Sequence, residues 1–311
     1  MRRLSALLLS ALLPASAHAV ARTSASFLQR PMGAQAAGMG SAFAAVSGSI
    51  DSLQYNPSGA ATLPKRIASS TFLKGFGDSS YGYFAYAHPT SLGTFAGSFM
   101  YYNAGTISLN LSDGTTGSVV AERNFAYSAT YARRLAYGLF VGGTYRYVSL
   151  ELAEAAKASS SQTDVGFLWH SPWKGLSAGA AYQFIGPDIT FESAGDPPPK
   201  TLRYGVAWRF PDVDPLKVDP SVDLEEFDVT ASFDNAVVLH EDASPRLGLE
   251  LGMRPPSLSR VALRTGWIIG RDAEGFTFGL GFAQGRFGFD YAFGNSPELG
   301  NLQHFTLSAR F

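Results

Sequence analysis

The sequence predicts an all-β protein, a transmembrane antiparallel β-barrel of about 14 strands, preceded by an N-terminal helical or irregular segment. Three observations lead to this fold class. Segments of roughly ten residues alternate with period two, their two faces differ in chemistry, and a short apolar stretch precedes them. Glycine is abundant and only 16% of the residues are charged, a composition typical of many strands and not of a helical enzyme.

The first residues have the pattern of a secretory signal peptide. Arg2 and Arg3 supply a positive region, residues 4–13 form a short apolar core, and residues 17–19 (Ala-His-Ala) match the small-x-small cleavage pattern. The apolar core is too short to span the roughly 30 Å of bilayer hydrocarbon. We therefore expect residues 1–19 to be cleaved when the chain is exported.

Residues 201–210 illustrate the alternation of the strands that follow. The even-numbered positions, from Leu202 to Phe210, carry large apolar side chains, and the odd-numbered positions carry small or polar ones. The predicted strands are residues 67–76, 81–87, 92–102, 124–134, 137–150, 163–170, 175–184, 201–210, 226–234, 245–254, 260–269, 275–283, 286–293 and 302–311. The last segment ends on Phe311, which resembles the terminal aromatic signature that the outer-membrane assembly machinery reads.

The second face of these strands distinguishes a barrel from a soluble sandwich. In a sandwich that face meets water and gathers charges, whereas here it holds mostly small residues, as expected in a crowded lumen. A charge that faces mid-bilayer lipid costs about 2–4 kcal/mol, and the one clear exception, Arg133, lies beside a turn. The candidate lumen-facing polar residues are Arg146, Arg203, Arg209, Arg246, Glu250, Arg264 and Asp290. They form structural ion pairs or hold the carboxylate headgroup of a ligand, and the sequence leaves both roles open.

The lengths of the connections orient the barrel, because bacterial barrels have short periplasmic turns and long outer loops. If the first strand runs outward, the long connections fall outside, at residues 103–123, 151–162, 185–200 and 235–244. The short connections fall inside, at residues 135–136, 170–174, 253–259 and 284–285. The acidic, proline-rich residues 211–225 break this rule. We also expect an irregular strand and a side opening at residues 92–102, since Asn103-Ala104-Gly105 favours a break there.

Residues 20–66 do not alternate and form the predicted hatch. Asn56 is suited to accept a hydrogen bond from the first free N–H groups of a short helix, and Pro57 suits the first helical position. The motif glycines, which permit close backbone approach, are Gly38, Gly40 and Gly59. Two roles remain open for this segment, a plug that fills the lumen and a gate that moves or contacts a ligand.

The block at residues 31–46, together with residues 51–61, resembles the hatch motif of the FadL/PorV-like outer-membrane families. Residues 246–311 are similar to the C-terminal half of PorV/PorQ-type proteins. This chain departs from the pattern at Ser58, where alanine is usual, and at residues 47–49, where acidic residues are common.

The resemblance covers nearly the whole mature chain. It implies a 14-stranded barrel at residues 67–311, with the hatch of residues 20–66 inside its lumen. It also implies an integral protein of the Gram-negative outer membrane, in contact with outer-membrane lipid.

Nothing in the sequence points to an enzyme, a metal or a cofactor. No nucleotide-binding loop is present, and the acidic residues between 212 and 223 are interrupted by prolines and do not match a calcium loop. A formal charge of −1 without a basic cluster argues against a nucleic-acid partner. The lack of cysteine leaves no disulfide and no thiolate metal site.

Two functions from different classes remain. The first is a barrel that binds and transports hydrophobic small molecules, long-chain fatty-acid-like by the FadL-side resemblance. The second is a PorV/PorQ-type accessory barrel that acts in type IX secretion or in the surface attachment of exported cargo proteins. Apolar residues facing the lumen favour the first, and a large outer surface over a blocked lumen favours the second. We expect a monomeric barrel in either case.

Overall fold

The computed structural model describes residues 23–75, 77–110, 115–191, 194–211, 227–255, 258–271, 275–295 and 301–311. The predicted signal peptide lies outside these ranges. All but the first residue of the 211–225 connection also lies outside them.

Fourteen antiparallel strands close into a barrel, in the order β1-β18-β17-β16-β15-β14-β13-β12-β9-β8-β7-β6-β3-β2, which confirms the predicted fold class. Each strand matches one of the predicted alternating segments. The bounds are β1 Ile67–Lys74, β2 Ser80–Thr90, β3 Gly93–Asn103, β6 Glu122–Arg134, β7 Leu139–Leu152, β8 Ala156–His170, β9 Leu176–Ile185, β12 Thr201–Pro211, β13 Phe227–Val238, β14 Ser244–Met253, β15 Arg260–Ile268, β16 Phe276–Gln284, β17 Phe287–Gly294 and β18 Leu302–Arg310.

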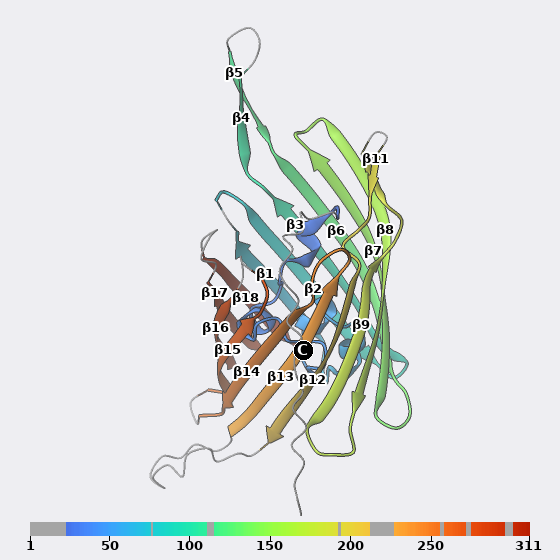
Figure 1. Ribbon diagram of the computed structural model, residues 1–311. Helices are drawn as coiled ribbons and strands as arrows, with labels where there is room; N and C mark the ends of the chain where they lie inside the picture. The colour runs from blue at the N-terminus through green and yellow to red at the C-terminus, as the bar shows by residue number, and fades with distance from the viewer. Residues whose placement is uncertain are drawn as a thin grey trace, which may run out of the picture.

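The two ends of the barrel differ. One end, called here the hairpin end, carries two extra hairpins, β4 (Thr106–Asn110) with β5 (Thr116–Val120) and β10 (Ile189–Phe191) with β11 (Ala194–Asp196). The β4–β5 hairpin projects well beyond the neighbouring strands (Figure 1). The opposite end, called the turn end, has short connections such as residues 91–92 and 135–138.

Two of the predicted long connections are wrong. Residues 151–162 are mostly strand, because β7 continues to Leu152 and β8 begins at Ala156. Residues 235–244 are likewise shortened by the extension of β13 to Val238. Residues 156–162 lack large apolar side chains on the outer face, so their sequence resembles a loop although their backbone continues the sheet.

The predicted irregular strand at residues 92–102 is also wrong. The β3 strand pairs with β2 and with β6 without a register shift. The irregularity lies instead between β8 and β9, where the register shifts between Thr163 and Val165. Phe184 of β9 has a positive φ of 59° at this bulge, and its N–H donates to Oδ1 of Asp164 at 2.7 Å. A carboxylate therefore replaces the ladder partner that the bulge removes.

Large apolar side chains point outward and small or polar ones point inward. On β12, Trp208 is 45% exposed and its neighbour Ala207 is 4% exposed. The same contrast runs along β8, where inward and outward residues alternate through the whole strand. The outer surface is therefore a continuous apolar and aromatic band, the reverse of a soluble protein.

The hatch fills the lumen with short helical turns. Its elements are η1 (Ser26–Gln29), α1 (Ala34–Gly38), η2 (Ile50–Gln54) and η3 (Pro57–Thr62). Figure 1 shows this segment, in blue, within the barrel. None of the helices in the described ranges is long and apolar enough to cross a membrane.

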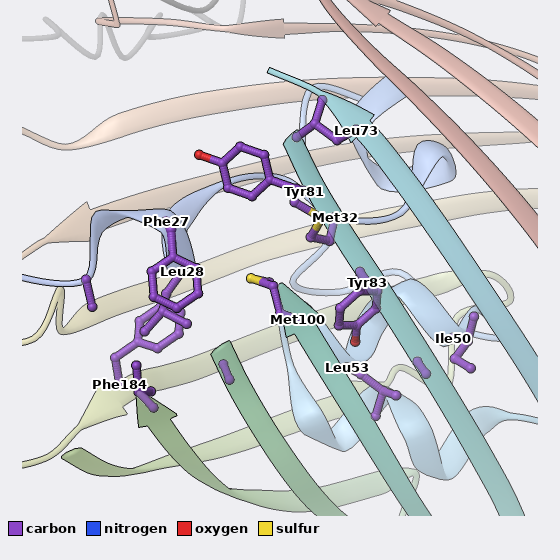
Figure 2. Close-up of a cluster of buried hydrophobic side chains, with 14 of the residues drawn as sticks. Phe27, Leu28, Met32, Ile50, Leu53, Leu73, Tyr81, Tyr83, Met100 and Phe184 are labelled. Carbon is purple, nitrogen blue, oxygen red and sulfur yellow. The ribbon is translucent and has the colours of Figure 1, made fainter. Parts of the chain in front are cut away.

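An apolar cluster joins the hatch to the wall on one side of the lumen. Phe27, Leu28 and Met32 of the hatch belong to the same buried cluster as Tyr81 and Met100 of the wall (Figure 2). The burial of these side chains, worth about 25 cal/mol per Å² of apolar surface, holds this side of the hatch. Two further apolar clusters join the hatch to other strands, through Phe140, Leu168 and Ala207 in one and Ala292 in the other.

The outward apolar band leads to a prediction about membrane burial. Leu249, in the middle of β14, faces outward, and Leu249→Arg should lower the free energy of unfolding in lipid vesicles by about 2–4 kcal/mol. The control Leu135→Arg, in the β6–β7 turn, should cost about 0–1 kcal/mol because turns lie near the interface. Denaturant titration in vesicles measures both. Equal costs at the two positions would contradict burial of the band in lipid.

Candidate functional site

The Asn56-Pro57 pair adopts the capping geometry that the sequence predicts. The side chain of Asn56 accepts from the N–H of Ser58 at 3.2 Å, and Pro57 occupies the first position of η3, which is a 3₁₀ helix. The Asn56 amide nitrogen also donates to the carbonyl of Phe167 on β8, at 2.9 Å. One side chain thus caps a hatch element and ties it to the wall.

The three glycines of the hatch motif lie where a side chain does not fit. A Cβ on Gly38 would meet the Cα of Gly279 at 3.0 Å, and one on Gly59 would meet the Cβ of Ser52 at 2.6 Å. Gly40 has a φ of +61°, and a Cβ there would lie 2.7 Å from the carbonyl oxygen of Leu247. Close approach therefore explains all three, and a left-handed backbone also requires glycine at position 40.

The wall presents its own glycines to the hatch, a set that we call the glycine seat. A Cβ on any of them would collide with hatch atoms, for example on Gly142 with Pro57 and on Gly266 with Gly40. Several lie opposite each other on adjacent strands, as Gly248 does with Gly266. The members of the seat are Gly142, Gly166, Gly179, Gly248, Gly266 and Gly279. They leave bare backbone surface against which the irregular hatch packs.

Wall side chains also supply partners for the hatch backbone. Oδ2 of Asp234, on β13, accepts from the N–H groups of Phe43 and Ala44, both at 2.7 Å. A buried backbone group left without a partner costs about 1–3 kcal/mol, so these contacts decide whether the hatch is stable in the lumen. Further contacts of this kind join Thr306 to Ala34, Thr277 to Gly38 and Gly40, His304 to Pro31, Ser177 to Ala45 and Gln183 to Gln54.

Asp51 is a buried carboxyl at the centre of the hatch. Its Oδ2 accepts from the N–H of Ala36 at 3.1 Å, and its carboxylate occupies the space that a Cβ on Gly33 would need. Burial raises the pKa of Asp51 to about 7, assisted by repulsion from Asp290 and opposed by the Ala36 N–H and the charge of Arg264. The carboxyl therefore changes its charge near neutral pH.

The predicted lumen-facing residues fall into separate groups, and four of them join one chain of ion pairs at the turn end. Nε of Arg264 lies 2.6 Å from Glu250, and its Nη1 lies 2.7 Å from Asp290. Arg209 joins through Asp228, at 3.4 Å. Arg260, which the sequence analysis did not select, links Asp228 to Glu250, and Gln35 of the hatch donates to Glu250 at 2.9 Å.

The other three predicted residues lie elsewhere. Arg146 pairs with Asp164 at 2.9 Å, and its guanidinium lies 4.7 Å from the ring centroid of Phe184. This pair supports the β8–β9 bulge. Arg203 and Arg246 are both buried on the hairpin side of the hatch.

Sequence analysis missed three wall carboxylates: Asp164 and Asp228 pair with these arginines, and Asp234 accepts from the hatch backbone. Asp164, Asp228 and Asp234 all occupy inward positions of their strands, so the period-two alternation contains the signal that would have found them. Arg30 and Asp51 lie in the hatch, which has no periodicity, and no sequence pattern indicates their roles.

The hatch divides the interior into two chambers. The turn-end chamber has a volume of about 470 Å³ and is mostly polar, lined by Ser47, Asp51, His170, Arg209, Arg260 and Thr306 among others. The hairpin-end chamber has a volume of about 260 Å³ and includes Phe27, Arg30, Tyr81, Tyr102, Arg203 and Arg246 in its lining. The two chambers share no lining residue. Passage between them therefore requires part of the hatch to move.

Solved structures of hydrocarbon channels share this fold. The toluene transporter TbuX of Ralstonia pickettii superposes with a TM-score of 0.56 at 14% identity, over 90% of this chain and 98% of that one. The toluene transporter TodX of Pseudomonas putida gives a TM-score of 0.57 at 12% identity, over 90% and 96%. The CymD monoaromatic hydrocarbon channel gives 0.55 at 11% identity, over 90% and 97%.

At these identities the likeness shows the fold. No protein-family model matches the sequence, and no curated protein matches it. The structural neighbours are hydrocarbon channels of the FadL/TodX type, in agreement with the FadL side of the resemblance. The PorV/PorQ side stays a prediction.

The glycine seat leads to a prediction with a matched control. In Gly266→Ala the new Cβ would collide with the hatch backbone at Gly40, whereas a Cβ added at Gly82, on β2, would have no heavy atom within 4 Å. Gly266→Ala should lower the free energy of unfolding by about 1–3 kcal/mol and expose Arg30 of the hatch to trypsin. Gly82→Ala should do neither. Denaturant titration and limited proteolysis measure the two effects, and equal behaviour of both variants would contradict close hatch packing.

The raised pKa of Asp51 predicts a pH dependence. A carboxyl whose folded-state pKa is raised contributes most stability below its ordinary pKa and loses that contribution as pH rises through about 7. The thermal midpoint of the wild type should therefore fall between pH 5 and pH 8, because the charged carboxylate is buried. In Asp51→Asn this component should vanish, and subtracting the two profiles removes other titrating groups such as His170. Identical profiles would show that Asp51 does not titrate in this range.

Proposed function

We propose that this protein is a channel of the Gram-negative outer membrane for hydrophobic small molecules. The observation that carries the proposal is the apolar lumen surface beside the hairpin-end chamber. Tyr81, Tyr83 and Met100 of the wall belong to the same buried apolar cluster as Phe27 of the hatch (Figure 2). Phe27 and Tyr81 also line the chamber itself. A water-filled pore has no need of such a surface.

The barrel exterior supports placement in a membrane. Its outward residues form a continuous apolar band, as in barrels that cross the outer membrane with their strands. In this orientation the hairpin end faces outward and the turn end faces the periplasm, since the longer connections are extracellular in such barrels. The likeness to two toluene transporters and a monoaromatic hydrocarbon channel supports the proposed cargo.

The proposed mechanism has three steps. A hydrophobic molecule enters the hairpin-end chamber, the hatch shifts, and the molecule leaves through the turn-end chamber or through the wall. An exit through the wall is not expected at β3, because β3 pairs regularly with both neighbours. The β8–β9 bulge at Phe184 is the irregular pairing in the described barrel and is the proposed place for such an exit.

The secretion role remains the second candidate and rests on the resemblance to PorV/PorQ-type proteins. The apolar lumen surface favours small molecules over that role. A specific affinity for long-chain acids also stays a prediction of the resemblance.

The proposal is tested by the initial rate of uptake of radiolabelled toluene in a Gram-negative host, with and without the chain. The chain should raise the rate. Val238→Trp, which fills the hairpin-end chamber, should return the rate to that of cells without the chain. Val237→Trp is the matched control, because the next residue of β13 faces the opposite side of the strand. A wild-type chain that leaves toluene uptake unchanged would sink the proposal.

A further inference from the structure

The hairpin-end chamber has an unusual charge distribution for a hydrocarbon site. Four arginines line it, Arg30, Arg203, Arg246 and Arg271, and its lining among the described residues includes no Asp or Glu. Arg271 is paired outside the chamber lining, with Glu241 at 2.7 Å. A chamber built only for neutral hydrocarbons gains nothing from buried guanidinium groups, which are costly to remove from water.

Arg203 is the best-placed cation of the four. Its residue is 7% exposed, and its Nη1 donates to the carbonyl of Ser41 at 3.3 Å. Its guanidinium lies 5.0 Å from the ring centroid of Tyr55. Its Nε is buried without a hydrogen-bond partner, so one N–H of the fork is left for another acceptor.

The nearest strand does not supply that acceptor. Asp234 lies on β13, beside β12, and its charge acts on Arg203, but its Oδ2 accepts from two hatch N–H groups and its Oδ1 has no hydrogen-bond partner. Within the described parts of the chain, no carboxylate oxygen lies within 4.0 Å of a guanidinium nitrogen of Arg203. Arg246, also buried at 6% exposed, lines the same chamber from β14.

Five aromatic residues also line the chamber: Phe27, Tyr55, Tyr81, Tyr102 and Phe184. The ring of Phe27 stacks on Tyr102 with centroids 6.1 Å apart, and Tyr102 packs on Tyr81 at 4.5 Å. Phe184 closes the chamber beside the β8–β9 bulge. These rings form an aromatic surface on the chamber wall, and aromatic pairs favour stacked or tilted contacts.

We propose that the hairpin-end chamber binds a compact aromatic carboxylate, with its carboxylate on Arg203 and Arg246 and its ring among Phe27, Tyr81 and Tyr102. Guanidinium groups match carboxylates through paired N–H donors. The chamber volume of about 260 Å³ lies below the range of about 300–1,000 Å³ found for drug-sized ligands, which favours a single ring. This inference rests on the proposed channel function and narrows its cargo to an acid.

Benzoate and toluene test the inference as a matched pair, because they share the ring and differ in the carboxylate. Binding to the full-length mature protein in an uncharged detergent is measured by calorimetry. Benzoate should bind more tightly than toluene. Arg246→Gln should weaken benzoate binding about tenfold or more and leave toluene binding unchanged, because toluene has no charge for the guanidinium to bind.

Arg209→Gln is the control variant, with the same substitution made on β12 but in the turn-end chamber. It should leave benzoate binding unchanged. Arg203→Gln should weaken benzoate binding as Arg246→Gln does. Arg203 also contacts the hatch, so the protection of Arg30 from trypsin is measured in parallel. If Arg203→Gln loses this protection, the test rests on Arg246→Gln alone.

The outcomes separate this inference from the proposed function. If toluene uptake persists but benzoate binds no more tightly than toluene, the acid site is wrong and the hydrocarbon channel stands. The acid site is also wrong if Arg246→Gln leaves benzoate binding unchanged. If the chain neither binds benzoate nor raises toluene uptake, both proposals fall.

Discussion

Every backbone N–H and C=O group that the hatch carries into the lumen needs a partner, because the interior offers little water and the hatch has almost no regular structure. The wall meets this need in two ways. Side chains such as Asp234 and Thr277 reach inward to the hatch backbone, and the glycine seat removes side chains where the hatch must touch the sheet. The position of the hatch, the division into two chambers and the access to each of them all depend on this fit.

The same fit explains the arrangement of charges. At the turn end, arginines and carboxylates neutralise each other across β12, β13, β14, β15 and β17. At the hairpin end, the carboxylate of Asp234 accepts hydrogen bonds from the hatch backbone, and the Nε of Arg203 has no hydrogen-bond partner. Among the described residues, the lining of the hairpin-end chamber holds arginines and no carboxylate, whereas the turn-end lining holds both. The hatch can therefore influence the electrostatics of the lumen through the wall groups that it engages.

Period-two alternation was sufficient to locate all 14 strands, because lipid imposes a strong contrast between the two faces of the sheet. The alternation did not reveal strand where the two faces no longer differ in chemistry. Residues 156–162 of β8 continue to alternate in burial, but serine and alanine dominate both faces, as expected beyond the bilayer where both faces meet water. The β8–β9 bulge was missed for another reason. Its residue with positive φ is Phe184 and not a glycine, and the bulge is stabilised by the carboxylate of Asp164 on the neighbouring strand. In the hatch, local chemistry predicted the Asn56 cap, whereas Asp51 and Arg30 depend on contacts far apart in sequence.

The closing seam of the barrel has a consequence for how the molecule assembles. The first strand pairs with the last, from Ile67 opposite Arg310 to Lys74 opposite Gln303, and the hatch runs directly into that first strand. The hydrogen-bonded ring of strands is thus closed by β1, the strand that directly follows the hatch in the chain. The segment that fills the lumen and the strand that closes the barrel are thus consecutive in the chain, so the position of one restricts the position of the other.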